Sequence, residues 1–493
     1  MKWEIVIGLE VHAELSTKSK IFCSCTTAYG GEPNTHVCPV CSGMPGVLPV
    51  LNREVVEYAL RLGLALNCSV TKYCKFDRKN YFYPDLPKAY QVSQLYAPIC
   101  CDGFLEIEVP NEETAAGSKK KIRIREIHME EDAGKLNHST HGSLMDFNRC
   151  GVPLLEIVSQ PDFICESASD AALEVTAYLE KLRETLLYLD ISDCKMQEGS
   201  MRADINLSVR RSGGELGVRT ETKNMNSFKA IGRAIEYEID RQIDILEDGG
   251  KIIQETRRWD DEKGMSYGMR SKENAQDYRY FPDPDLLPLN IDDDWILRVK
   301  RNLPELACQK RERYTRDYRI SADEAGVLNC HKNISDLFET LAQKSEAAGF
   351  SGAALESAHL ISGEIMRLMN NANMLPEELT ADVDKLAMCI GFVISGKINR
   401  ASFKETVEAV FLNNVDPESY IAEKGLMMIS DDKAIIEAVK KVLAQNESSA
   451  AEYRAGKEKV FGFLMGMAMK ELGKGGNPEL VKKVLQSELT KNI

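Results

Sequence analysis

The sequence lacks several features that would assign the protein to a familiar class. It has no apolar run approaching the roughly 20 residues that span a bilayer, no internal repeat and no low-complexity tract. Its first residues, Met1-Lys2-Trp3-Glu4, lead directly into an alternating strand pattern, which predicts that no signal peptide is present. The GxxxxGK[ST] and GxGxxG motifs are also missing, so a bound nucleotide would lie on a sheet rather than on a glycine-rich loop.

Positive charge is in deficit, with 62 Lys and Arg against 76 Asp and Glu and a net charge of −14. This balance argues against a general affinity for nucleic acid. Residues 451–493 are an exception, because eight Lys and Arg there face five Glu, and a second basic stretch runs from Lys310 to Arg319. Such segments could contact phosphates, although solvated helix faces explain them equally well.

The fourteen cysteines, without an export signal, favour a reducing, cytoplasmic compartment. Cys23-Ser-Cys25 and Cys38-Pro-Val-Cys41 form two close pairs separated by a loop, which is typical of a tetrahedral Zn²⁺ site. A chance cluster or a disulfide is the alternative, and His36 could replace one thiolate. Because four thiolates leave no open position on the ion, we expect structural rather than catalytic zinc.

The chain divides into three regions by its hydrophobic pattern. Residues 1–291 show short alternating strands and one long helix pattern at 166–189, which predicts a mostly antiparallel sheet domain with a zinc-knuckle insertion at about 22–42. Residues 292–412 predict an all-α domain, and residues 413–493 a helical tail. The predicted fold class is therefore α+β.

Two strand patterns carry acids where an ordinary core would not. Between residues 4 and 15, Glu10, His12 and Glu14 share one face, for which an amphipathic edge is the simplest explanation. Glu156 is a lone acid inside a strand that is apolar on both faces. Because a buried, unpaired carboxylate is costly, Glu156 needs an arginine, a proton or a metal ion, and oxygen ligands suit Mg²⁺.

A third strand pattern changes phase. Its apolar positions switch parity between Ile124 and Ile127, which predicts a β-bulge near Arg125-Glu126. Beyond the bulge, Glu131 is expected to follow Ile127 on the apolar face, and it is a second acid at a core-facing position.

The remaining polar candidates lie in one strand and one loop. The strand pattern around Asp204 has a fully polar face, which indicates either solvent exposure or a place beside a metal and a phosphate. Residues 75–88 concentrate Arg78, Lys79 and Lys88 among aromatic residues and prolines. A rigid loop with these cations suits phosphate binding, and a packed surface loop is the alternative.

Seven ordered motifs resemble the B subunits of the aspartyl/glutamyl-tRNA amidotransferases. They are Ile7-Gly-Leu-Glu-Val-His12, Lys75-Phe-Asp-Arg-Lys-Asn-Tyr-Phe-Tyr-Pro-Asp85, His128-Met-Glu-Glu-Asp-Ala-Gly-Lys135, Pro153-Leu-Leu-Glu-Ile-Val158, Glu198-Gly-Ser-Met-Arg-Ala-Asp204, Lys223-Asn-Met-Asn-Ser-Phe228 and Asp277-Tyr-Arg-Tyr-Phe-Pro-Asp-Pro-Asp285. The similarity extends over essentially the whole chain, including a C-terminal region that looks like the tRNA-contacting tail of that family.

The resemblance implies a cradle domain akin to the sheet of glutamine synthetase and guanido kinases, followed by helical and tail domains. It implies a ligase that phosphorylates the side-chain carboxylate of Glu-tRNA(Gln) or Asp-tRNA(Asn) with ATP and then amidates it with ammonia derived from glutamine. The implied partners are the amidase (the A subunit), the small C subunit and the misacylated tRNA, with no role for a membrane. The sequence does not decide between the two tRNAs.

The resemblance also implies a Mg²⁺ site on His12, Glu131 and Glu156, with Glu10 adjacent. The four-cysteine motif occurs in only part of the family. We predict that Glu10 or Asp204 takes a proton from ammonium.

Two further groups complete the predicted site. The transferred phosphoryl group would be stabilised by Arg78, Lys79 or Lys88. The tail and its turn at 473–478 would contact the tRNA by shape, through Lys474, Gly475, Asn477, Lys482 and Lys483.

Two other functions compete with this prediction. An ATP-dependent ligase acting on a small free acid would suit the acidic net charge, but it would not need the long helical C-terminal half. A non-enzymatic, zinc-bearing tRNA scaffold would gain nothing from Glu156 inside an apolar strand.

Overall fold

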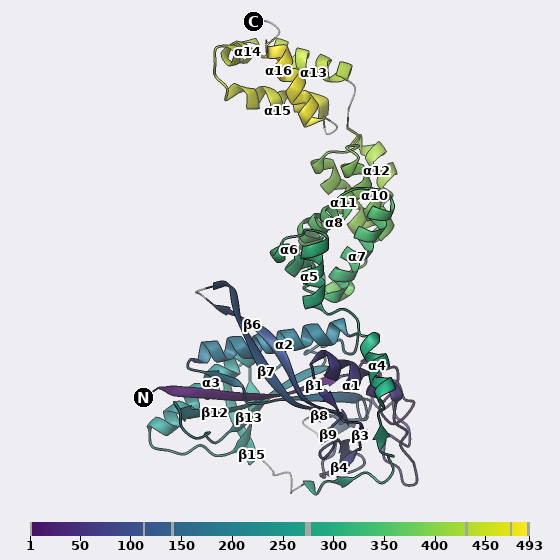
Figure 1. The fold of residues 1–493 in the computed structure, drawn as a ribbon, viewed down its shortest axis with the longest axis vertical. Coiled ribbons are helices and arrows are strands. Elements are labelled where there is room, and N and C mark those ends of the chain that lie inside the picture. Colours follow the sequence, from purple (N-terminus) through teal and green to yellow (C-terminus); the bar gives the residue numbers. More distant parts are fainter. Residues whose placement is uncertain are drawn as a thin grey trace. The chain divides into compact units, whose positions relative to one another are not determined.

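The computed structural model describes residues 2–111, 114–139, 142–271, 278–428, 432–473 and 476–490. The chain forms two compact units, Met1–Leu306 and Ala307–Ile493 (Figure 1). An N-terminal sheet unit followed by a helical unit confirms the coarse prediction, whereas the division into three domains stays a prediction. Within the described ranges, no helix is long and apolar enough to cross a membrane.

The first unit is built on one large sheet with the strand order β15-β14-β13-β12-β1-β10-β7-β6-β2, and β11 also pairs with β1. All its pairings are antiparallel except that between β13 and β14. The strands are β1 (Trp3–Glu14), β2 (Ser69–Val70), β6 (Cys100–Asn111), β7 (Thr114–Glu131), β10 (Pro153–Ser159), β11 (Phe163–Cys165), β12 (Met201–Arg211), β13 (Thr220–Lys223), β14 (Glu255–Asp260) and β15 (Met265–Ser271).

Three small sheets accompany the large one. They are β16-β4-β5, β17-β3 and β8-β9. Their strands are β3 (Tyr73–Cys74), β4 (Asp77–Asn80), β5 (Tyr90–Ser93), β8 (Lys135–Ser139), β9 (Gly142–Asp146), β16 (Phe281–Pro282) and β17 (Leu289–Asn290). In the first of these sheets, Phe281 pairs with Arg78. This pairing joins residues 75–88, which carry the three candidate phosphate-binding cations, to a segment about 200 residues later in the chain.

Three helices cover one face of the large sheet: α1 (Arg53–Ala65), α2 (Ala168–Tyr188) and α3 (Phe228–Glu247) (Figure 1). Each begins after a residue whose side chain accepts a hydrogen bond from a backbone N–H of the first turn, and these capping residues are Asn52, Ser167 and Ser227. The predicted helix at 166–189 is confirmed by α2. The prediction was incomplete, since no expected helix covered α1 or α3.

The polarity of β1 decides where a site can form. Its odd-numbered residues Ile5, Ile7, Leu9, Val11 and Ala13 are buried in the same core as the three helices. Because side chains alternate along a strand, Glu10, His12 and Glu14 lie on the opposite face. The helix-free face of the sheet is therefore the polar one.

The predicted β-bulge is confirmed. Val158 of β10 pairs with Glu126 of β7 while Ser159 pairs with Ile124, so Arg125 is the extra residue. The bulge keeps both Ile124 and Ile127 in the core and turns the following even-numbered residues toward the polar face.

The second unit is helical. Its helices are α5 (Ala307–Asp317), α6 (Ala322–Leu328), α7 (Lys332–Ala347), α8 (Ala353–His359), the π-helix η2 (Leu360–Ile365), α9 (Met366–Ala372), the 3₁₀-helix η3 (Pro376–Glu378), α10 (Val383–Ile394), α11 (Arg400–Asn413), α12 (Pro417–Lys424), α13 (Asp432–Gln445), α14 (Glu447–Arg454), α15 (Val460–Leu472) and α16 (Pro478–Thr490). One apolar cluster includes Phe338 and Ile390, and a separate one includes Leu464 and Leu485. The preceding helix α4 (Asp293–Arg301) instead buries Val299 in the core of the first unit.

Candidate functional site

The centre of the site follows from the register of three neighbouring strands. His12 of β1 pairs with Glu156 of β10 on one side and with Arg202 of β12 on the other. Glu156 in turn pairs with His128 of β7. Residues that pair across strands point to the same side of a sheet, so these side chains meet on the polar face.

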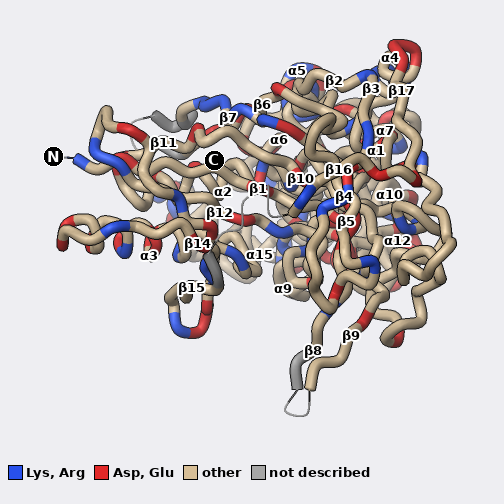
Figure 2. Tube along the Cα trace, turned by 90° about the horizontal axis from the view of Figure 1, so that it is seen from below, with Lys and Arg blue, Asp and Glu red and all other residues tan. Residues whose placement is uncertain are grey.

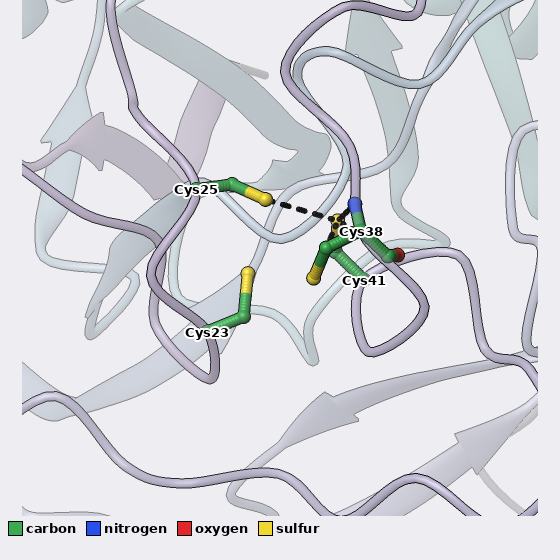
Figure 3. A group of neighbouring side chains, drawn as sticks. All are labelled: Cys23, Cys25, Cys38 and Cys41. Carbon is green, nitrogen blue, oxygen red and sulfur yellow. Dashed lines mark hydrogen bonds between the residues drawn. The ribbon is translucent and has the colours of Figure 1, made fainter.

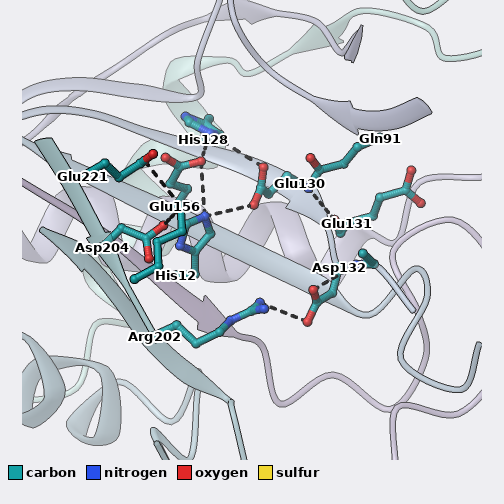
Figure 4. Close-up of polar contacts among 12 residues, drawn as sticks. His12, Gln91, His128, Glu130, Glu131, Asp132, Glu156, Arg202, Asp204 and Glu221 are labelled. Carbon is teal, nitrogen blue, oxygen red and sulfur yellow. Dashed lines mark hydrogen bonds and ion pairs between the residues drawn. The ribbon is translucent and has the colours of Figure 1, made fainter. Parts of the chain in front are cut away.

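His12, Glu130 and Glu156 form the closest group (Figure 4). His12 Nε2 lies 3.4 Å from Glu130 Oε1 and 3.5 Å from Glu156 Oε2, and His128 Nε2 lies 2.8 Å from the same Glu156 oxygen. One ligand atom from each of the three residues lies within 4.8 Å of the others. An imidazole with two carboxylates is a donor set that suits a divalent cation.

This grouping differs from the predicted set of His12, Glu131 and Glu156, because it contains Glu130 in place of Glu131. Glu131 is buried and points away from the His12 group (Figure 4). Its Oε2 lies 2.6 Å from Lys88 Nζ, and its Oε1 accepts a hydrogen bond from Val92 N at 2.9 Å. The predicted parity of Glu131 was right, but the site lies on the polar face. Glu130, one residue earlier, supplies the carboxylate that the prediction gave to Glu131.

The group requires positive charge. Burial opposes protonation of His12, but the carboxylates of Glu156, Glu130 and Asp204 raise its pKa to about 9. Although burial acts in the other direction, His128 and His12 hold the pKa of Glu156 well below its usual range. Burial and the neighbouring Glu156 raise the pKa of Glu130. A cation at this point would take over the charge that the imidazolium ring provides.

A second acidic group adjoins the first. Oxygen atoms of Glu10, Asp204 and Glu221 lie within 4.8 Å of one another. Lys223 forms an ion pair with Asp204, and its Nζ lies 3.4 Å from Glu221 Oε1. The two predicted proton acceptors, Glu10 and Asp204, are therefore brought together. The prediction missed Glu221 and Lys223, although Lys223 opens one of the motifs in the sequence.

Two of the three predicted phosphate-binding cations are engaged with acids. Arg78 Nε lies 2.8 Å from Asp283 Oδ2, and Arg78 Nη2 lies 2.6 Å from Asp285 Oδ2. Acidic and basic residues accordingly lie together around β4, β5 and β16 (Figure 2). Lys88 pairs with Glu131, and both residues, with Arg78, line a cavity of about 210 Å³.

Lys79 occupies a different environment, because neighbouring residues of β4 point to opposite sides. Its ammonium lies 5.2 Å from the centre of the Tyr278 ring. Burial lowers its pKa, but Tyr280, Glu130 and Glu156 together raise it well above the ordinary value. Of the three cations, Lys79 is thus the one coupled electrostatically to the His12 group.

An open cleft of about 550 Å³ borders these acids. Its lining includes His12 and Glu130 and the cationic side chains of Arg202, Lys223 and Arg258. Such a mixed lining can bind an anionic group close to the acidic centre.

The four predicted zinc ligands meet at one point. One Sγ atom from each of Cys23, Cys25, Cys38 and Cys41 lies within 4.8 Å of the others, and His36 does not belong to the group (Figure 3). None of the fourteen cysteines forms a disulfide. A hydrogen bond with Cys23 and, against burial, the nearby Lys20 ammonium lower the pKa of Cys41 to about 4. Four converging sulfurs fit a tetrahedral zinc ion.

The predicted tRNA contacts lie partly on α16. The side chain of Asn477 accepts hydrogen bonds from Glu479 N at 3.1 Å and Leu480 N at 3.2 Å, and so caps the helix. Lys482 and Lys483 are exposed. The other two residues of the predicted set, Lys474 and Gly475, lie outside the described residues.

Known proteins match this chain along its length. Residues 5–297 match the GatB/GatE catalytic domain, and residues 336–489 match the GatB domain. The chain is 54% identical to a protein of Lachnoclostridium phytofermentans over 99% of both chains. It is 52% identical to one of Caldicellulosiruptor bescii and 50% identical to one of Thermoanaerobacter pseudethanolicus, each over 100% of both chains. All three relatives are named as the B subunit of an aspartyl/glutamyl-tRNA(Asn/Gln) amidotransferase. The chain therefore belongs to the family of aspartyl/glutamyl-tRNA(Asn/Gln) amidotransferase B subunits.

Proposed function

We propose that this chain activates the side-chain carboxylate of Glu-tRNA(Gln), Asp-tRNA(Asn) or both by ATP-dependent phosphorylation and then amidates it. The chain is one subunit of a glutamine-dependent ligase. The observation that carries the proposal is the His12–Glu130–Glu156 group on the open face of the sheet, in a chain with full-length membership of the family.

Mg²⁺ fits the group, and His12, Glu130 and Glu156 would hold it. The ion would supply charge neutralisation for the phosphates of ATP. Glu156 hydrogen-bonds His128 and lies near His12, so its position is maintained by residues of β1 and β7. Substituting Glu156 removes a ligand and leaves His12 and His128 without this acid.

Lys79 is the cation we assign to the transferred phosphoryl group, because Arg78 and Lys88 already neutralise other acids. A preorganised ammonium in a site shielded from water stabilises charge that develops on a phosphoryl group. Arg78 and Lys88 then support the wall of the site instead of contacting substrate.

Glu10 and Asp204 are the groups that we assign to proton transfer. Ammonium is not nucleophilic until it loses a proton, and a carboxylate beside the activated substrate can accept it. Lys223 holds Asp204 by an ion pair, and Asn206 donates to Glu10 Oε1 at 2.9 Å, so both acids are oriented. Water has to be kept from the acyl phosphate during the reaction, because it would hydrolyse this intermediate.

The rest of the molecule serves the assembly. The amidase, or A subunit, supplies ammonia, the small C subunit completes the complex, and the tail at 413–493 binds the tRNA through the exposed lysines of α16. The sheet acts as a cradle of the glutamine synthetase and guanido kinase type, followed by the helical domain at 292–412. The four cysteines hold a structural Zn²⁺. The site of action is the cytoplasm, where aminoacyl-tRNA is used.

The test uses the chain reconstituted with its partner subunits. Amidation and ADP release are measured with ATP, glutamine and each misacylated tRNA, and both should require the tRNA. ADP release with free glutamate or aspartate alone would favour the small-acid ligase, and absence of ATP turnover with either tRNA would favour the scaffold. Glu156→Gln should lose amidation while retaining tRNA affinity.

A further inference from the structure

Residues 145–151 comprise the end of β9 and most of the loop that leads to β10, and we call them the loop 145–151. They lie against the cysteine knuckle, by which we mean residues 22–42. Asn34 donates to Met145 O at 2.9 Å and accepts from Phe147 N at 2.8 Å. Asn148 accepts from His36 N at 2.8 Å and donates to the backbone of the knuckle, at Glu32 O, at 2.7 Å. Two side-chain amides thus replace the regular backbone ladder that an irregular loop cannot form.

A buried lysine joins the same two segments next to the sulfur atoms. Lys20 is fully buried, and its ammonium donates to His36 O at 2.7 Å and to Phe147 O at 3.4 Å. The same nitrogen lies 3.6 Å from Cys41 Sγ. A buried ammonium needs compensating charge, which thiolates at the metal centre provide. Lys20 therefore links the knuckle and the loop 145–151 to a sulfur atom of the cysteine group.

The other side of the loop 145–151 reaches the cleft. Arg149 Nε donates to Ala133 O at 3.0 Å and lies 3.3 Å from Asp132 Oδ2, and its Nη2 donates to Gly134 O at 3.1 Å. The Asp132 carboxylate also accepts from Arg202 Nη2 at 3.0 Å. Asp132, Ala133 and Arg202 line the cleft of about 550 Å³, and Arg149, which is not among the lining residues, contacts Asp132 and Ala133.

We infer that the metal centre of the cysteine knuckle holds Arg149 in place, and that Arg149 positions Asp132 and the Ala133–Gly134 segment in the wall of the substrate cleft. Arg149 is a positioning residue, since it acts through Asp132. This inference rests on zinc binding in the proposed function. It gives the zinc ion a task in substrate binding in addition to local folding.

The metal centre can affect Arg149 because few contacts separate the cysteine group from this residue. Cys41 and Arg149 are joined through Lys20 and Phe147 O, and Cys150, the residue after Arg149, donates from Sγ to Cys41 O at 3.4 Å. Without the ion, the four thiols, which lie within 4.8 Å of one another, lose the bonds to a common centre and keep only weak hydrogen bonds among themselves. The knuckle then loosens, and the loop loses the partners of Asn148 and Lys20.

The first test needs no activity. Hydrogen exchange is measured on the complex with zinc bound and after removal of zinc by a chelator. The amides of Phe147, Asp132 and Gly151 are followed, of which the last two bond Val152 O and Asp132 O. We expect exchange at all three to become at least about tenfold faster, as for loss of one hydrogen bond. Unchanged exchange at Asp132 and Gly151 overturns the inference.

The second test separates positioning from stability. Asn148→Ala removes the hydrogen bonds of the loop to His36 N and Glu32 O without touching a cysteine or the cleft, and Thr35→Ala, whose hydroxyl bonds Glu32 O inside the knuckle, is the control. Zinc content should stay that of the wild type in both. Asn148→Ala should raise the KM for misacylated tRNA about tenfold with a smaller change in kcat, and Thr35→Ala should leave both unchanged.

A double-mutant cycle completes the design. If the loop acts through Arg149, Asn148→Ala combined with Arg149→Ala should change KM no more than Arg149→Ala alone. Effects that multiply, or an unchanged KM in Asn148→Ala, refute the inference. If the wild-type complex does not amidate tRNA, the proposed function fails, while the exchange experiment still decides whether the metal centre controls Asp132.

Discussion

Two adjacent glutamates of β7 allow the site to be tested with a matched pair of substitutions. Glu130 faces His12 and Glu156, and Glu131 faces Lys88 on the other side of the sheet. Glu130→Gln and Glu131→Gln are the same chemical change at neighbouring positions. They should nevertheless have opposite consequences for activity and stability.

Glu131→Gln should mainly destabilise the fold. The side chains of Lys88 and Glu131 are only 11% and 3% exposed, so the ion pair is screened little by solvent. Removing one partner of a buried pair leaves the other charge uncompensated, which typically costs about 3–5 kcal/mol. We therefore expect the free energy of unfolding to fall by that amount, with ATP turnover per folded molecule largely kept.

Glu130→Gln should mainly abolish catalysis. It removes one of the three groups that converge on the proposed Mg²⁺ and relieves repulsion between Glu130 and Glu156. We expect unfolding free energy within about 1 kcal/mol of the wild type. Amidation should fall by at least about 100-fold, since even outer-shell changes at metal sites cost up to that much.

The assay compares urea denaturation of each purified chain with ATP-dependent amidation by the reconstituted complex, and titrates Mg²⁺ by calorimetry. Glu130→Gln should weaken Mg²⁺ binding, and Glu131→Gln should not. The reasoning is refuted if Glu131→Gln is as stable as the wild type but inactive, or if Glu130→Gln binds Mg²⁺ and amidates normally.

Three further predictions follow from other parts of the chain. Burial raises the pKa of Glu238, but hydrogen bonds, first among them that from Arg241, lower it overall, so the Glu238 carboxylate contributes stability above about pH 4.5 that is lost as pH falls through its folded pKa. The difference in unfolding free energy between the wild type and Glu238→Gln should therefore shrink below pH 4.5, and a constant difference would contradict this. Lys482→Ala combined with Lys483→Ala should weaken tRNA binding and lower the slope of log affinity against log salt by about 2, and an unchanged slope in filter binding would exclude phosphate contacts there. Cys38→Ser should lose the bound zinc measured by a colorimetric chelator and lower the melting temperature, whereas one retained zinc per chain would reject the four-cysteine site.

The sequence by itself determined the direction of several side chains in the site and the convergence of the cysteines. Alternation along β1 predicted that Glu10, His12 and Glu14 share a face, and the parity change between Ile124 and Ile127 predicted the bulge at Arg125. The spacing of the cysteine pairs predicted their convergence. These signals are readable because side-chain direction in a strand and ligand spacing in a tight turn depend only on neighbouring residues.

Tertiary structure decided which face became the site. The parity of Glu131 was correct, yet helices α1, α2 and α3 cover the apolar face, so the acid that joins His12 is Glu130. The partners of Arg78 are Asp283 and Asp285, about 200 residues later in the chain. Which face is covered, and which acid neutralises which cation, depend on contacts between remote segments, and periodicity within one strand carries no information about them.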